Sequence, residues 1–137
     1  LRSGILMKVV YFSVTGQTKR FAAKLNAYET IEIDPTAELE MKEPYVLVVP
    51  TYEAEFIAPV FDFLETGENQ KFLAGVSGSG NRNFAELFVF SAKEIAKKYG
   101  VPLIYAFEFS GTKEDVDNFE EEVRELERKT TMVRAQQ

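Results

Sequence analysis

A short polar turn between an apolar run and a helical pattern constrains the fold of this chain more than any other feature. The apolar run at residues 9–12 is typical of a strand in the middle of a parallel sheet, where both faces are covered. Apolar residues at helical spacing follow at residues 20–25, and the turn at residues 13–18 connects the two. A buried strand, a tight turn and a helix in this order indicate the first unit of an α/β domain.

The turn has the composition of a phosphate-binding loop. Hydroxyl groups at Ser13, Thr15 and Thr18 surround Gly16, which allows the backbone to bend so that several N–H groups converge at a helix N-terminus. The turn lacks the lysine of a nucleoside triphosphate loop and the three glycines of a dinucleotide-binding fingerprint. We therefore expect it to bind a monophosphate. The alternative is that the hydroxyl groups only cap the helix.

The remainder of the chain alternates between strand and helix patterns. The longest helical pattern covers residues 84–99 and places Phe84 and Leu87 on the same apolar stripe as Ile95. No internal repeat or linker interrupts the alternation, so the sequence predicts one doubly wound parallel sheet with helices on both faces. Further strands are expected at residues 30–33, 45–50, 72–76 and 103–107, and further helices at 57–64 and from 112 onward.

The composition is that of one domain whose redox chemistry, if it has any, depends on a bound cofactor. The chain has 137 residues with no cysteine and no histidine, so thiol chemistry and the usual metal ligands are absent. Its 22 acidic and 16 basic residues give a net charge of −6, which argues against nucleic acid and anionic membranes as partners and suits a cytoplasmic protein. We expect a single domain at residues 7–129, an expression remnant at 1–6 and a frayed polar tail at 130–137.

Three polar loops are expected to meet at one edge of this sheet. They follow the first, third and fourth strands, at residues 13–18, 51–55 and 77–83. Because open parallel sheets bind ligands outside the carboxyl ends of their strands, these loops predict a cleft with a phosphate site and room for a flat ring. In the third loop, glycines allow close approach to a ligand, and Asn81 and Asn83 offer donors and acceptors. The alternative is a glycine-rich turn in which Asn83 caps the next helix.

These motifs closely resemble those of the NrdI family, flavodoxin-like proteins that activate class Ib ribonucleotide reductase. The resemblance extends from the first strand to the last helix. The asparagine-rich loop and the Phe-Glu-x-x-Gly-Thr segment are characteristic of the family, whereas the first motif is shared with flavodoxins in general. The stretches that carry the resemblance are residues 11–13 and 15–21 (YFS and TGQTKRF), 78–84 (GSGNRNF), 100–102 (GVP), 107–112 (FEFSGT) and 115–116 (DV).

The resemblance implies a five-stranded flavodoxin-like sheet, in the strand order 2-1-3-4-5, that binds FMN. It also implies that an unidentified reductant reduces the flavin and that the reduced flavin then reacts with molecular oxygen. The resulting oxidant would pass to the dimanganese site of the radical subunit. Such a protein is an accessory redox activator rather than a stand-alone enzyme, with its chemistry on the flavin and not on a catalytic side chain or a protein-bound metal.

The resemblance also assigns residues to the cofactor and to the partner. Arg82, the one cation of the third loop, is the expected contact to the radical subunit. The expected FMN contacts are Ser13, Val14, Thr15, Gly16, Gln17 and Thr18 at the phosphate, Thr51, Tyr52 and Glu53 beside the ring, and Gly78, Ser79, Gly80, Asn81, Asn83 and Phe84 over its other face and polar edge.

Phe84 has a second interpretation, because its helical spacing also suits a place in the core. Glu108 and Thr112 are expected to hold the last strand and the last helix together. The sequence departs from the family pattern after Tyr52, where many relatives have glycines and this chain has acidic residues and an alanine at 53–55. Because side chains disfavour a positive φ, we expect the backbone turn that flavodoxins make beside the ring to be disfavoured here.

Two other functions compete with the activator. An electron-transfer flavodoxin shares the fold and the phosphate loop, but the compact glycine- and asparagine-rich loop favours the activator. A flavin-free phospho-receiver domain has the same topology. It would need an aspartate at the end of the third strand, where this chain has Pro50 and Thr51, so that function is disfavoured.

Overall fold

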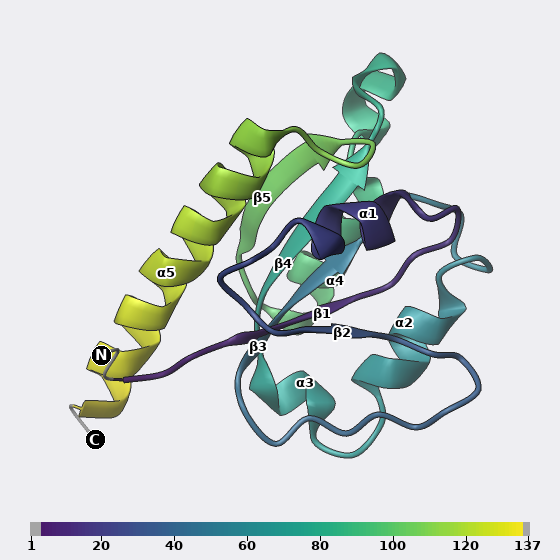
Figure 1. The fold of residues 1–137 in the computed structure, drawn as a ribbon. Coiled ribbons are helices and arrows are strands. Elements are labelled where there is room, and N and C mark those ends of the chain that lie inside the picture. Colours follow the sequence, from purple (N-terminus) through teal and green to yellow (C-terminus); the bar gives the residue numbers. More distant parts are fainter. Residues whose placement is uncertain (1–3, 136–137) are drawn as a thin grey trace.

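The chain forms a parallel sheet with helices on both faces (Figure 1). The structure is a computed structural model and describes residues 4–135. Its sheet has five strands in the order β2-β1-β3-β4-β5, which confirms the predicted fold class and strand order. The strands are β1 (Lys8–Tyr11), β2 (Thr30–Glu32), β3 (Tyr45–Val49), β4 (Leu73–Gly80) and β5 (Leu103–Glu108). The helices are α1 (Gln17–Ala23), α2 (Ala58–Leu64), α3 (Asn69–Phe72), the 3-10 helix η1 (Arg82–Leu87), α4 (Phe90–Tyr99) and α5 (Lys113–Ala135).

The two faces of the sheet belong to two separate apolar cores. Leu47 and Val49 of β3 share a core with α2 and α4, whereas Val46 and Val48 share the other core with α1 and α5. All residues of β3 are buried. Because both faces of the central strands are covered, these strands have continuous apolar sequences, and this pattern is why they could be located from the sequence. Each parallel strand is reached by a crossover, so the loops that follow the strands lie at one carboxyl edge.

The glycine-rich stretch differs from the prediction. β4 continues to Gly80, so Gly78 and Ser79 belong to the strand and not to a loop. Gly78 pairs with Val49 of β3. A Cβ atom on Gly78 would lie only 2.5 Å from the Cβ atom of Ala92, so this glycine leaves the room that α4 needs to pack against the strand.

The predicted helix at residues 84–99 is wrong over its first part. Residues 82–87 form η1, and α4 begins only at Phe90. Two non-glycine residues with positive φ interrupt the helix, namely Ala85 (φ 52°, ψ −118°) and Val89 (φ 49°). As a result, Leu87 is 56% exposed, and the predicted apolar stripe packs against the core only from Phe88 onward.

A buried asparagine organises the loop between β2 and β3. Asn69 Oδ1 accepts a hydrogen bond from the Met41 N–H (2.7 Å), and Asn69 Nδ2 donates to the carbonyl oxygens of Leu39 (2.8 Å) and Phe63 (2.7 Å). Met41 is therefore buried, although it lies in the acidic stretch at residues 38–43. Asn69 lies on α3, a helix that the sequence pattern does not predict. Because α3 ends at Phe72, the prediction that β4 begins at residue 72 is wrong by one residue.

The C-terminal helix is longer than predicted. α5 continues to Ala135, so the expected frayed tail from residue 130 is helical as far as the structure describes it, and residues 136–137 lie outside the described part. Near the other end of the chain, the Ile5 N–H donates to Thr131 Oγ1 at 3.0 Å. The described end of the segment at 1–6 therefore contacts α5, and its assignment as an expression remnant stays a prediction.

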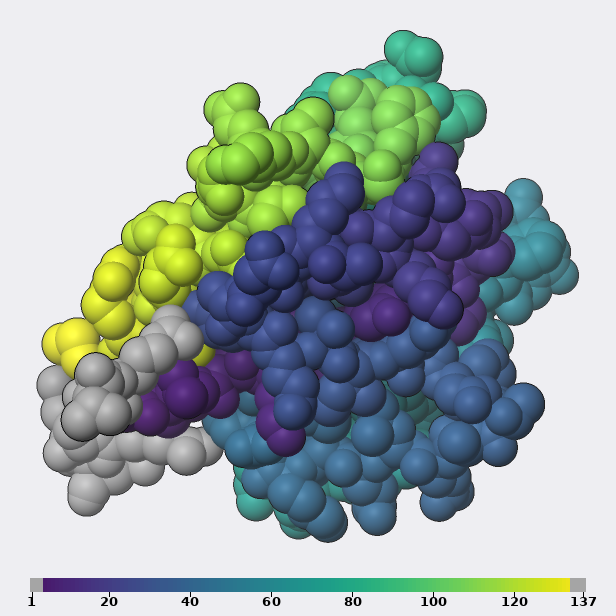
Figure 2. All heavy atoms as spheres, viewed as in Figure 1, coloured from purple at the N-terminus to yellow at the C-terminus, as the bar shows by residue number. Residues whose placement is uncertain are grey.

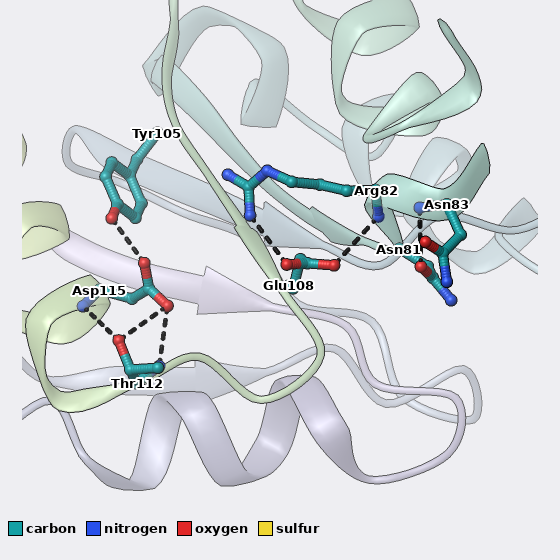
Figure 3. Close-up of polar contacts among 7 residues, drawn as sticks. All are labelled: Asn81, Arg82, Asn83, Tyr105, Glu108, Thr112 and Asp115. Carbon is teal, nitrogen blue, oxygen red and sulfur yellow. Dashed lines mark hydrogen bonds and ion pairs between the residues drawn. The ribbon is translucent and has the colours of Figure 1, made fainter. Parts of the chain in front are cut away.

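Thr112 and Asp115 cap the start of α5 (Figure 3). The N–H and the hydroxyl of Thr112 donate to Asp115 Oδ2 (2.8 and 3.1 Å), and the Asp115 N–H donates to Thr112 Oγ1 (3.1 Å). The Tyr105 hydroxyl of β5 donates to Asp115 Oδ1 at 2.7 Å, so strand and helix are joined here. Burial acts to raise the pKa of Asp115, but the hydrogen bonds from Tyr105 and Thr112 outweigh burial and hold the pKa below its ordinary value.

Replacing Gly78 by alanine should destabilise the fold, because the new Cβ atom would overlap that of Ala92. We expect the free energy of unfolding to fall by about 1–3 kcal/mol. Ala92→Gly alone should cost about 1 kcal/mol through helix propensity. The double variant removes the overlap, so its loss should be smaller than the sum of the two single losses. Urea unfolding followed by circular dichroism measures all four proteins, and strictly additive losses would contradict the contact.

Asp115→Asn should lower stability at neutral pH and have less effect in acid. Because the folded-state pKa lies below the ordinary value of 3.8, the ionised carboxylate stabilises the fold above that pH, and this contribution is lost as the pH falls through the folded-state pKa. The difference in unfolding midpoint between the variant and the unaltered protein should thus shrink between about pH 7 and about pH 3. A difference that stays constant over this range would show that the charge of Asp115 is unimportant.

Candidate functional site

A cavity of about 960 Å³ opens at the carboxyl edge of the sheet. Its walls come from the loops after β1, β3 and β4 and from the β5–α5 connection, and α4 closes one side. A volume of this size is typical of small-molecule and cofactor sites, and this edge is where open parallel sheets bind ligands. The three loops predicted from the sequence to meet do line one cavity.

The first wall is the turn after β1. Gly16 is the N-cap of α1, and its φ of 95° lies in the region that favours glycine. Ser13 Oγ accepts hydrogen bonds from the N–H groups of Gly16 (3.1 Å) and Lys19 (3.3 Å), so Ser13 plays the capping role considered as the alternative. Thr18 differs, because it lines the cavity, is only 1% exposed and has no hydrogen-bond partner for its hydroxyl within the described residues. A buried hydroxyl of this kind is suited to a ligand oxygen.

The second wall is the loop after β3, and hydrogen bonds fix it on both sides. Thr51 Oγ1 donates to the carbonyl oxygen of Ser79 at 2.6 Å. The Tyr52 N–H donates to Ser91 Oγ (3.2 Å), and the Ser91 hydroxyl donates to the Tyr52 carbonyl oxygen (3.1 Å). The Tyr52 hydroxyl donates to Thr15 Oγ1 at 3.3 Å, so the second wall is tied to the first.

The acidic segment after Tyr52 is a tight turn. The Phe56 N–H donates to the carbonyl oxygen of Glu53 (2.9 Å), and the Ile57 N–H donates to that of Ala54 (3.2 Å). Every residue of this turn has a negative φ, so the turn does not use a left-handed conformation. Glu53 and Phe56 line the cavity.

The third wall is the end of β4 together with residues 81–88. Asn81 Oδ1 accepts a hydrogen bond from the Asn83 N–H at 2.9 Å. The Arg82 N–H donates to Glu108 Oε2 (3.1 Å), and Arg82 Nη1 donates to Glu108 Oε1 (3.0 Å), as Figure 3 shows. The Arg82 guanidinium also lies 4.6 Å from the centroid of the Phe88 ring. The prediction that Glu108 joins the last strand to the last helix is therefore wrong, because Glu108 joins the strand to the segment at 81–88.

A ring of exposed apolar side chains surrounds the cavity. Phe84 is 63% exposed and lines the cavity, so a place for it in the core is wrong. The segment that carries Phe84 projects beyond the rest of the molecule, in teal at the top of Figures 1 and 2. Exposed apolar groups that are gathered in this way mark a ligand or protein contact. The members of the ring are Val14, Phe56, Phe84, Leu87, Phe90 and Phe109.

Most of the predicted cofactor contacts line the cavity, and their contact with FMN stays a prediction. Ser13 and Gly16 shape the first turn from outside the lining, Gly78 packs under α4, and the exposed Asn83 and Arg82 also lie outside the lining. The residues that line it are Val14, Thr15, Gln17, Thr18, Thr51, Tyr52, Glu53, Ser79, Gly80, Asn81 and Phe84.

Several lining residues are absent from the sequence prediction. Phe109 follows β5 directly and has a φ of 54°, so its side chain reaches the cavity from a segment that the prediction treats only as a strand–helix junction. Its place after the last strand, at the same carboxyl edge as the other loops, was the available signal. The other lining residues outside the predicted FMN contacts come from two places. The segment around the start of α4 provides Leu87, Phe90, Ser91 and Glu94, and the stretch after β3 provides Pro50, Ala54, Phe56 and Ile57.

The cavity is acidic and apolar rather than basic. Glu53 and Glu94 line it, and no lysine or arginine of the described chain does. Across residues 4–135, no group of three or more histidine, cysteine, aspartate or glutamate side chains could hold a metal, and no helix is long and apolar enough to cross a membrane. These walls fit a cofactor with a flat apolar ring whose phosphate is bound by hydroxyl and N–H groups rather than by ion pairs.

Comparisons with known proteins agree with this geometry. A family model described as NrdI flavodoxin-like matches residues 9–121. The protein NrdI of Bartonella tribocorum is 47% identical to this chain over 79% of the chain and 86% of its own length. The protein NrdI of Brucella ovis is 39% identical over 80% of this chain and 87% of its own length.

Two solved structures of flavodoxins share the fold. A short-chain flavodoxin associated with a non-canonical PDU bacterial microcompartment superposes with a TM-score of 0.61 at 21% identity, over 93% of this chain and 99% of its own. The flavodoxin of Streptococcus pneumonia TIGR4 gives a TM-score of 0.58 at 23% identity, over 91% and 99%. Because the family model matches most of the chain and the two NrdI proteins share 47% and 39% identity with it, the chain belongs to the NrdI flavodoxin-like family.

Proposed function

We propose that this chain is a cytoplasmic, FMN-dependent activator of class Ib ribonucleotide reductase. Membership of the NrdI flavodoxin-like family makes it an FMN-binding redox protein tied to ribonucleotide reductase. The proposed activity is the reduction of molecular oxygen at the flavin and the delivery of the oxidant to the dimanganese site of the radical subunit. The observation that carries the proposal is one cavity with a rim of exposed apolar side chains and a buried Thr18 hydroxyl that has no hydrogen-bond partner among residues 4–135. Such a cavity suits both a phosphorylated flat cofactor and a protein that covers it.

The turn after β1 is proposed to hold the FMN phosphate. The buried Thr18 hydroxyl has no partner in the part of the chain that the structure describes, and Thr15 and Gln17 line the same cavity. Gly16 gives the backbone the left-handed conformation that begins the helix, so that N–H groups of the turn can point toward an anion. Tyr52 and Phe84, which come from different walls, are proposed to border the ring.

The redox chemistry is assigned to the cofactor because the chain has no cysteine and no histidine. FMN, when bound, would supply the electrons that reduce oxygen. The protein supplies a binding site, a cavity that is open on one side, and a rim that another protein can cover. We propose that the radical subunit covers this rim, which would separate the oxidant from bulk water on its way to the metal site. An unidentified reductant is proposed to reduce the flavin beforehand.

Tyrosyl radical formation tests this activity directly. The FMN-loaded chain is reduced, mixed with its cognate radical subunit loaded with Mn(II), and exposed to oxygen, and the tyrosyl radical is followed by electron paramagnetic resonance. We expect a radical only when the reduced chain, oxygen and manganese are all present. A protein that binds FMN and passes electrons to a redox partner, but produces no radical under these conditions, would instead be an electron-transfer flavodoxin.

Gly16→Val should weaken FMN binding by about tenfold or more, because a β-branched side chain at this positive φ distorts the turn that is proposed to hold the phosphate. Riboflavin, which lacks the phosphate, should bind the unaltered protein much more weakly than FMN. The matched control is Gly100→Val, since Gly100 has a φ of +67° with open space around it and lies outside the cavity. Fluorescence titration of flavin-free protein gives the affinities, and equal affinities for FMN and riboflavin would rule out a phosphate site.

Arg82→Glu should weaken binding to the radical subunit while FMN stays bound at saturating concentration, because charge reversal in an interface can cost several kcal/mol. The control is Lys71→Glu, which makes the same change of net charge on α3, away from the cavity. Titration of each FMN-loaded protein against the radical subunit compares the affinities. If Arg82→Glu and Lys71→Glu bind alike, Arg82 is not part of the interface.

A further inference from the structure

We propose that Glu108 is a positioning residue which, through Arg82, sets the apolar wall of the cofactor cavity. We call residues 81–88 the flap. The flap carries Phe84 and Leu87, which both line the cavity. The inference rests on the proposed function, because the ligand that the flap contacts is taken to be the flavin ring.

Glu108 lies at the point where the flap leaves the sheet. It is the register partner of Gly80, the last residue of β4, and the Phe109 N–H donates to the Gly80 carbonyl oxygen at 3.2 Å. One oxygen of the Glu108 carboxylate accepts the Arg82 N–H, and the other accepts the guanidinium (Figure 3). Both the backbone and the side chain of Arg82 are therefore fixed to β5.

The remaining hydrogen bonds of the flap are local, and its last residue, Phe88, packs against the apolar core. The Phe84 N–H donates to the Asn81 carbonyl oxygen (3.0 Å), and the Phe88 N–H donates to that of Ala85 (2.9 Å), so these bonds shape the flap without fixing it to the sheet. The side chains of residues 82–87 are exposed. The Arg82 guanidinium contacts both Glu108 and the Phe88 ring, so it joins the two ends of the flap to each other and to the strand.

The contribution of this arrangement is small but sufficient to affect binding. Arg82 and Glu108 side chains are 59% and 35% exposed, and an exposed ion pair alone contributes little. The charge-assisted hydrogen bond to a backbone N–H and the cation–π contact with Phe88 add to it. We therefore expect changes of about three- to tenfold in flavin affinity, and not a loss of the fold.

The test is a double-mutant cycle on the full-length protein freed of flavin. Glu108→Ala and Arg82→Met should each weaken both FMN and riboflavin by the same factor, about three- to tenfold, because the flap contacts the ring and not the phosphate. The double variant should bind no more weakly than the poorer single variant. Arg124→Met is the matched control, since Arg124 has an ion pair with Glu121 at the same distance of 3.0 Å on α5, outside the cavity. It should leave both affinities unchanged.

The visible circular dichroism spectrum of the bound flavin, recorded at saturating FMN, reports the surroundings of the ring. This spectrum would not change if Glu108 and Arg82 only stabilised the fold. The spectra of the two single variants and of the double variant should differ from that of the unaltered protein in the same way. Exchange of the two charges, Arg82→Glu with Glu108→Arg, should restore part of the affinity. Unchanged affinities and spectra, or additive losses in the double variant, would overturn the positioning role while the proposed function stands. An unaltered protein that binds neither flavin would overturn both, whereas flavin binding without radical formation would overturn only the activator function.

Discussion

Burial of β3 on both faces is the constraint on which the rest of this structure depends. Its residues face α2 and α4 on one side and α1 and α5 on the other, and none reaches solvent. Full burial of an aliphatic side chain contributes about 1.5–3 kcal/mol, so a strand of this kind is stable only where helices cover both faces. Helical crossovers then bring the loops after β1, β3, β4 and β5 to one edge, and the cavity lies where these loops meet.

Close packing of α4 against β4 determines the position of one cavity wall. Gly78 allows α4 to approach β4, and Ser91 on the first turn of α4 then reaches the backbone of Tyr52. The position of the second wall thus depends on a glycine that lies outside the cavity lining. The third wall depends on Arg82 and Glu108 in a similar way, because neither lines the cavity and both position residues that do. In both walls, packing and hydrogen bonds behind the lining determine what the lining presents to a ligand.

The sequence predicts the buried strands, their order and the first turn, because these features depend on local apolar runs and on the resemblance to a known family. It does not predict the flap correctly, for two physical reasons. Apolar side chains that line a ligand site can have the same spacing as core residues, so the sequence allows Phe84 a place in a core helix that it does not occupy. The residues that end the helical pattern, Ala85 and Val89, have a positive φ without being glycine, and the partner of Arg82 lies 26 residues away.

The identity and amount of the nucleotide released on denaturation of the purified protein test the central claim, which is that this cavity binds FMN. The account predicts a yellow protein that releases FMN in a ratio of about one per chain, or a colourless protein that takes up FMN to that ratio when it is added. A colourless protein that takes up no FMN would contradict the account.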